Sequence, residues 1–175
     1  KEKIYEIGII FEEYGDNAIL VREIPGILGK ISIKELFDDL YIQLEKFDEV
    51  NLSNYQIEKL FSSIACHNSI RAGRKLNIEE MNNLLRLMEK SDEKTVDYDF
   101  YRLGFAIAQI NKMFIMAQAQ NKIVLIDQHA AHERIVLESL KLSYLKNKIE
   151  RQVLLMPEIL EVGPSDFQVL HRLPF

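Results

Sequence analysis

The stretch DQHAAHERIVLE, residues 127–138, gathers three acids and two histidines directly after the apolar run KIVLI. If a helix begins near His129, then His129 and Glu133 are one turn apart and share a face. An imidazole and a carboxylate in that arrangement make up half of a divalent-metal site. Asp127 ends the preceding strand, where catalytic carboxylates of α/β folds often project. The spacing therefore predicts a candidate metal site at a strand-to-helix junction.

The other titratable residues of the stretch are not assigned to the same ion. Glu138 lies nine positions beyond His129, which at about 100° per residue places it on the opposite face, and His132 also points elsewhere. A less specific interpretation stays open, because a histidine and a glutamate at this helical spacing are typical of a solvated ion pair. Cys66 alone is likewise more often a small buried hydrophobe than a metal ligand.

The composition sets bounds on the class of protein. Of the 175 residues, 47% are hydrophobic and 28% charged, as in one globular domain or two small lobes that share a core. The net charge of −5 argues against a large basic surface, so nucleic-acid binding must be local or borrowed from another domain. A single cysteine, no apolar run of about 20 residues and no signal-peptide pattern predict a cytoplasmic protein without a membrane partner.

Apolar periodicity predicts helices and strands on either side of a polar linker at residues 91–99. Before the linker we expect two strands, at residues 4–14 and 17–24, and three helices, at residues 32–47, 54–70 and 76–90. After it we expect strands at residues 104–110, 113–119 and 122–127. A helix at residues 131–149, an extended segment at residues 152–162 and a short helix from Ser165 or Asp166 would follow. Asn77 lies three residues before Glu80, a capping-box spacing that predicts the start of the third helix.

Several of these patterns together resemble a known family. DQHAAHERIVLE fits Asp-Gln-His-Ala-x-x-Glu-x-x-x-x-Glu at every fixed position, and GFAIAQINKMFIMAQ precedes it. SIACHNSIRAGRKLNIEEMNNLL resembles a second signature, an Ala-Cys pair followed by a basic residue and a helix, and VREIPGIL resembles a strand with a proline turn. Over nearly its whole length the chain is similar to the C-terminal domain of MutL mismatch-repair proteins of the type that carries endonuclease activity.

The resemblance implies an α/β (α+β) fold, a two-lobed domain with a small mixed sheet flanked by helices. An inner lobe, for dimerisation and the metal site, would comprise residues 93–150 and 48–92. An outer, regulatory lobe would comprise residues 151–175 and 1–47. The family is a homodimer through the inner lobe, so Ile107, Ile115 and Met116 would lie either in that interface or in the core.

The resemblance also implies a site and its partners. His129, Glu133 and Cys66 would bind Zn²⁺ and/or Mn²⁺, and Asp127 and Glu133 would be the catalytic carboxylates in hydrolysis of a DNA phosphodiester. The mismatch-recognition protein MutS would be a partner through the full-length protein, and ATP would act only through an upstream domain. A cytoplasmic, nucleoid-associated bacterial protein would fit this role.

The sequence departs from the family pattern in two ways. The late Cys-x-His-Gly-Arg-Pro tract of the family's metal site is absent, since Cys66 is the one cysteine. This absence favours the alternative of a non-catalytic dimerisation scaffold. The two halves also stand in permuted order, because DQHAAHE follows ACH here and precedes it in the family. Joining Phe175 to Lys1 restores the usual order, which indicates a circular permutation or, as we favour, segments numbered out of genomic order.

A last motif suggests one more partner. RQVLLMPEIL contains Gln152, Leu154, Leu155 and Pro157, and resembles the Gln-x-Leu/Met-Leu/Ile-x-Pro peptide by which such proteins reach the replication sliding clamp. A glutamine amide and two apolar anchors suit an extended peptide that docks in an apolar pocket. The same residues would also suit a buried strand that leads into a proline turn.

Overall fold

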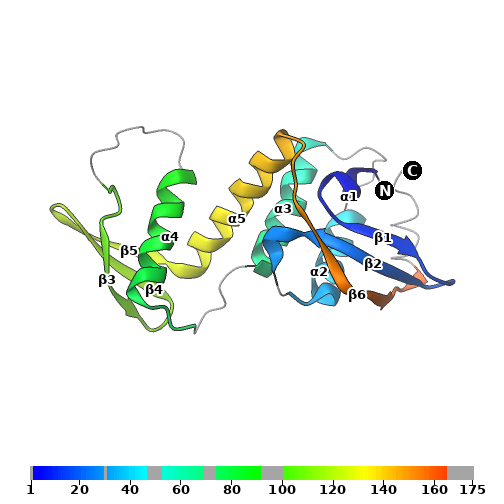
Figure 1. Ribbon diagram of the computed structural model, residues 1–175, viewed down its shortest axis with the longest axis horizontal. Helices are drawn as coiled ribbons and strands as arrows, with labels where there is room; N and C mark the ends of the chain where they lie inside the picture. The colour runs from blue at the N-terminus through cyan, green and yellow to red at the C-terminus, as the bar shows by residue number, and fades with distance from the viewer. Residues whose placement is uncertain (1, 30, 47–52, 69–73, 92–100, 165–175) are drawn as a thin grey trace. The chain divides into compact units, whose positions relative to one another are not determined.

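The computed structural model describes residues 2–29, 31–46, 53–68, 74–91 and 101–164 (Figure 1). The elements follow in the order α1 (Glu2–Glu6), β1 (Ile10–Glu13), β2 (Ala18–Pro25), the short 3-10 helix η1 (Gly26–Leu28), α2 (Ile33–Glu45), α3 (Asn54–Asn68), α4 (Ile78–Ser91), β3 (Phe105–Ile110), β4 (Phe114–Ala119), β5 (Lys122–Asp127), α5 (Gln128–Leu145) and β6 (Arg151–Glu161). None of the helices in these ranges combines the length and the apolar character that a membrane span requires.

The chain divides into two compact units, which are described separately. The first unit comprises Lys1–Asn68 and Leu140–Phe175, and the second comprises Ser69–Ser139. Helix α5 contributes its first part to the second unit and its last turns to the first. The predicted inner lobe began at residue 48 and so included α3, whereas the division groups α3 with the first unit. The two lobes as functional regions stay a prediction.

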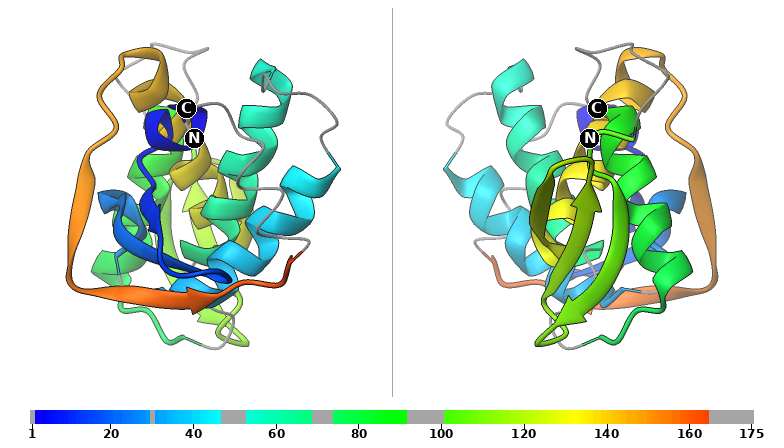
Figure 2. Two further views of the ribbon diagram at one scale, coloured as in Figure 1. Left: turned by 90° about the vertical axis from the view of Figure 1, so that its right-hand side faces the viewer. Right: turned by 90° about the vertical axis from the view of Figure 1, so that its left-hand side faces the viewer.

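The first unit contains the sheet β1–β2–β6, in which both pairs of strands are antiparallel. The left-hand view of Figure 2 shows β6, in orange, as the long strand of this sheet. Ile19 and Val21, two residues apart on the central strand β2, are fully buried, as expected for a sheet with one face on a core. Helix α2 buries a stripe of apolar side chains and is capped by Ser32, whose hydroxyl accepts a hydrogen bond from the Glu35 N–H at 3.3 Å.

Helix α3 packs within this unit against the last turns of α5. The rings of Phe61 and Tyr144 meet edge to face with their centroids 5.5 Å apart, and Lys141 Nζ lies 3.2 Å from Glu58 Oε1. The predicted single strand over residues 4–14 is wrong in its first half, which forms α1. Ile4 and Ile7 are three residues apart and both buried, a spacing that places them on one face of a helical turn but on opposite faces of a strand.

The second unit contains the antiparallel sheet β3–β4–β5 (Figure 2, right). Asn111 and Lys112 both have positive φ, 50° and 53°, as the tight hairpin turn between β3 and β4 requires. One face of the sheet packs on α4 and the start of α5 in a cluster of buried residues: Leu76, Met81, Leu84, Leu85, Ile115, Ala117, Ile126 and Ala131. Ile115 is fully buried in this cluster, so it belongs to the core, whereas Ile107 is 46% exposed.

Sequence patterns located most of these elements correctly. The capping box of α4 is confirmed by two hydrogen bonds, from Glu80 N–H to Asn77 Oδ1 at 2.8 Å and from Asn77 N–H to Glu80 Oε2 at 2.9 Å. The α/β (α+β) class is also confirmed, although the described strands form two antiparallel sheets instead of one mixed sheet. The short helix expected from residue 165 lies outside the described residues, as does all of the expected linker except Ser91.

Candidate metal centre at the start of helix α5

Asp127 ends β5 and caps α5. Its Oδ1 accepts hydrogen bonds from the backbone N–H groups of His129, at 2.8 Å, and Ala130, at 3.0 Å. These are the groups that a helix N-terminus leaves without intrahelical partners, and aspartate is among the best residues at this position. The helix therefore starts at Gln128, three residues earlier than predicted. The second carboxylate oxygen, Oδ2, takes no part in this capping and lies on an exposed side chain.

His129 and Glu133 lie on the first turns of α5 and both are half-buried. Because α5 is helical across both residues, they stand one turn apart on the same face, as predicted. A half-buried imidazole and carboxylate are less hydrated than a surface pair, so a cation bound between them would face less competition from water. The geometry of this pair therefore fits half of a metal site within the second unit.

His132 lies beside this pair in sequence and is also half-buried. Burial lowers the pKa of its imidazole below the usual value of 6.5, and electrostatic interactions with His129 and Arg74 lower that pKa further. Its Nδ1 is buried and has no hydrogen-bond partner among the described residues. The surroundings of His132 therefore favour the neutral imidazole over the charged one.

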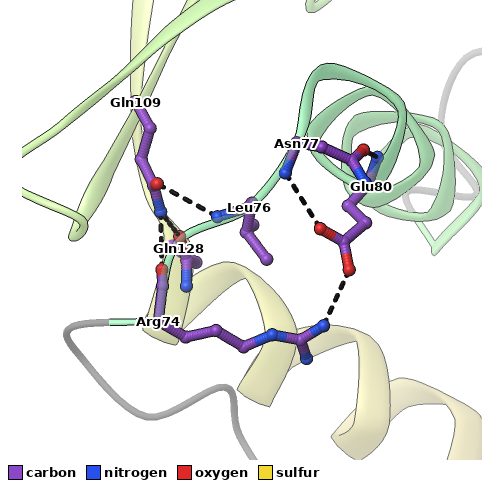
Figure 3. A network of polar contacts seen from close by, with 6 residues as sticks. All are labelled: Arg74, Leu76, Asn77, Glu80, Gln109 and Gln128. Atoms are coloured by element: carbon purple, nitrogen blue, oxygen red, sulfur yellow. Dashed lines mark hydrogen bonds and ion pairs between the residues drawn. The ribbon is translucent and has the colours of Figure 1, made fainter.

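A network of polar contacts joins the start of α5 to β3 and to the segment before α4 (Figure 3). Gln109 Nε2, from β3, donates hydrogen bonds to Gln128 Oε1 at 2.6 Å and to the Arg74 carbonyl at 2.9 Å. Gln109 Oε1 accepts one from the Leu76 N–H at 3.1 Å. Gln128 is only 1% exposed, and in the described part of the chain it is the one polar side chain classed as buried. The sequence pattern did not single out either glutamine, although Gln128 belongs to the DQH motif.

Cys66 lies on α3, in the first unit, and its side chain is exposed. The alternative of a small buried hydrophobe is therefore wrong, since the neighbouring Ala65 points into the core instead. Next to it, His67 Nε2 lies 2.8 Å from Asp39 Oδ2 of α2, a contact that ties the end of α3 to its own unit. Cys66 and the His129–Glu133 pair thus belong to different units, and the role of the thiol stays a prediction.

The stretch with the predicted clamp-binding residues lies on β6. Arg151, Gln152 and Val153 pair with β2, and pairing resumes only at Glu158, so residues 154–157 bulge from the sheet. Leu155 is fully exposed, at 104% of its reference area, and Gln152 and Pro157 are also exposed. Leu154 is half-buried. The buried-strand interpretation is therefore wrong for this stretch.

The fold and the site define a class of protein, an α+β domain with a candidate metal centre at a strand-to-helix junction and an apolar bulge on an edge strand. The chain belongs to the MutL C-terminal dimerisation domain family, whose model matches residues 1–76 and 107–173.

Its curated relatives carry the name DNA mismatch repair protein MutL. The protein of Rickettsia akari (strain Hartford) is 45% identical over 91 residues, which are 52% of this chain and 15% of that relative. The protein of Wolbachia sp. subsp. Brugia malayi (strain TRS) is 41% identical over 91 residues, which are 52% of this chain and 14% of that relative. The matched part of the chain thus spans about a seventh of the length of these relatives. No solved structure matches the chain.

Proposed function

We propose that the chain is the metal-dependent, DNA-nicking endonuclease and dimerisation domain of a MutL-type mismatch repair protein. The observation that carries the proposal is the half-buried His129–Glu133 pair on α5, with the Asp127 carboxylate at the start of the same helix. The proposal is tested by measuring Mn²⁺-dependent nicking of supercoiled plasmid together with the zinc content of the purified protein.

The chemistry of the donor set fits a divalent metal. His129 offers an imidazole nitrogen and Glu133 a carboxylate oxygen, and Cys66 would supply a thiolate. A mixed nitrogen, oxygen and sulfur set suits Zn²⁺, whereas the carboxylates of Asp127 and Glu133 suit Mn²⁺ or Mg²⁺. A bound divalent ion would lower the pKa of a coordinated water and neutralise charge on the scissile phosphate.

Each side chain has a defined part in this proposal. Asp127 Oδ1 holds the first turn of α5 in place, and Oδ2 is left for a cation. Glu133 would supply a negative charge and His129 a nitrogen lone pair, both from the same face of α5.

A non-catalytic dimerisation scaffold is the second candidate, favoured by the missing Cys-x-His-Gly-Arg-Pro tract. Either candidate needs partners. The net charge of −5 gives the domain little affinity of its own for DNA, so MutS and the ATP-binding region of the full-length protein would bring it to its substrate.

We propose that the domain forms a homodimer through the sheet face of the second unit that points away from the core. The exposed fractions of its apolar side chains are large, at 58% for Phe105, 46% for Ile107, 69% for Ile123 and 59% for Leu125. Leu125 pairs directly with Met116 on the central strand, so these residues form one continuous surface. An apolar surface of this kind on a folded domain is typical of a protein–protein interface.

Replacing both Ile123 and Leu125 by aspartate is expected to convert the dimer to monomer, because two charges would be buried without partners in the interface. Sedimentation velocity at micromolar concentration measures the change. Leu155→Asp is the control, since it places one such charge on an exposed leucine of the first unit. A folded double variant that stays dimeric would contradict this interface.

We also propose that the bulge on β6 docks on a replication sliding clamp. Four apolar side chains around it are exposed, namely Val153 at 68%, Leu155 at 104%, Met156 at 84% and Ile159 at 52%. Gln152 is exposed at the base of the bulge. A small peptide contact of this kind would bind in the micromolar range, about −8 kcal/mol, and tethering would raise the local concentration of a nuclease whose own charge repels DNA.

The double substitution Gln152→Ala with Leu155→Ala is expected to abolish clamp binding and to change the melting temperature by no more than about 2 °C. The small thermal effect follows from the full exposure of Leu155, which leaves no cavity on truncation. A pull-down with purified clamp and a thermal melt provide the two readouts. Leu160→Ala on the same strand is the control, because Leu160 is 7% exposed and its truncation should cost about 2–5 kcal/mol of stability. Unchanged binding in the double variant would exclude the bulge as the docking site.

A further inference from the structure

We propose that Gln109 and Gln128 form an amide pair that positions the metal-binding face of α5, so that both are positioning residues for His129 and Glu133. The inference rests on the proposed function, because it assigns a role toward the same metal. It concerns two side chains that would not themselves touch the ion.

Gln109 uses its whole amide to join three separate segments (Figure 3). Its Nε2 donates to Gln128 Oε1 at the start of α5 and to the Arg74 carbonyl, and its Oε1 accepts from the Leu76 N–H. Arg74 and Leu76 precede α4, and Gln109 itself is on β3. The network extends to the capping box, because Arg74 Nη2 also lies 2.7 Å from Glu80 Oε1. The start of α5 is thus tied through one side chain to a strand and to the beginning of another helix.

Gln128 is fixed at both its side chain and its backbone. Its side chain is 1% exposed and accepts from Gln109 at 2.6 Å, and its backbone N–H donates to the Met113 carbonyl at 2.9 Å. Two attachments on one residue, together with the Asp127 cap on the next two N–H groups, fix the rotation of the first turn about the helix axis. A single attachment would hold the helix in place without fixing that rotation.

Rotation matters because metal geometry tolerates little error. A ligand atom about 6 Å from the axis of a helix moves by about 1 Å for every 10° of rotation, whereas the metal–ligand distances of a working site lie within about 0.2 Å of their ideal values. A slack of only a few degrees in the first turn of α5 would therefore displace the His129 and Glu133 donors, relative to any ligand outside α5, by more than an ion accepts. A buried amide pair restrains that slack more strongly than exposed contacts do, because the low local dielectric strengthens its hydrogen bonds.

Co²⁺ titration of the whole chain, followed by visible absorption, tests the positioning role. Gln109→Met removes all three hydrogen bonds at nearly constant side-chain volume, and is expected to weaken Co²⁺ binding by about tenfold or more and to alter the ligand-field bands. Asn82→Ala is the matched control. Asn82 also links α4 to β3, by accepting from the Ala106 N–H at 2.9 Å, and it donates to the Ile78 carbonyl within α4 at 2.9 Å. The Co²⁺ affinity and the bands of Asn82→Ala should therefore equal those of the wild type.

A second variant decides the question if Gln109→Met does not fold. Gln128→Met breaks only the contact between the two amides and leaves the bonds of Gln109 to Arg74 and Leu76, and it should show the same loss of affinity. Wild-type affinity and bands in a folded Gln109→Met or Gln128→Met variant would overturn the positioning role while leaving the proposed metal site intact. Absence of Co²⁺ binding by the wild type would overturn the proposed function, and the positioning role with it.

Discussion

Replacing Asp127 by asparagine is expected to abolish DNA nicking while leaving the fold and the dimer unchanged. The carboxylate has two separable parts in the structure. Oδ1 caps α5 through the N–H groups of His129 and Ala130, and the amide oxygen of asparagine can accept the same two hydrogen bonds. The negative charge of the Asp127 carboxylate is required only to bind a cation. Its loss should lower the nicking rate by about 100-fold or more, equivalent to about 2.7 kcal/mol in the barrier.

A companion substitution separates the cap from the charge. Asp127→Ala removes both, so it should lose nicking to the same extent and also lose about 0.5–2 kcal/mol of stability. Initial rates on supercoiled plasmid and chemical denaturation give the two quantities. Full nicking activity in a folded Asp127→Asn variant would mean that Asp127 is a helix cap and nothing more.

The second large effect concerns metal content. His129→Ala and Cys66→Ser are each expected to reduce bound zinc from stoichiometric to near zero, because both side chains would bind one ion. Combining them should then add little, since the ion is already lost. Elemental analysis of the dialysed protein measures the stoichiometry. The thiolate and the imidazole must both be deprotonated to bind, so occupancy in the wild type should fall as the pH is lowered.

Glu138→Ala is the control for these ligand substitutions. Glu138 is on α5 as well, but it lies nine residues from His129 and so on the opposite face of the helix. Its removal should change stability more than zinc content. Zinc that stays stoichiometric in either His129→Ala or Cys66→Ser would place the metal on other residues.

Local patterns predicted those parts of the fold that local interactions determine. The capping box at Asn77 and Glu80, the turn at Asn111 and Lys112, and the three strands of the second unit all follow from neighbours within a few residues. The start of α5 was predicted too late, because Asp127 was interpreted as a catalytic carboxylate and its capping role was not recognised. Aspartate after a strand and before a helix suits both roles, and its sequence context is the same for each.

Contacts between distant segments could not be predicted in this way. Gln109 and Gln128 are 19 residues apart and Gln109 and Leu76 are 33 apart, so no periodicity links them. Ile115 and Met116 are adjacent on one strand, yet only the fold shows that Ile115 faces the core. The exposure of Leu155 likewise depends on an interrupted pairing between β2 and β6. A strand with the same composition and regular pairing could have buried that leucine.

The most direct test of a metal-dependent nuclease is the conversion of supercoiled plasmid to open circles by the purified, zinc-loaded chain. We predict nicking in Mn²⁺ that is abolished by a chelator and by Asp127→Asn, with the zinc content and the dimer unchanged in that variant. A folded, zinc-loaded dimer that leaves the plasmid supercoiled across a range of Mn²⁺ concentrations would contradict the nuclease and support the dimerisation scaffold.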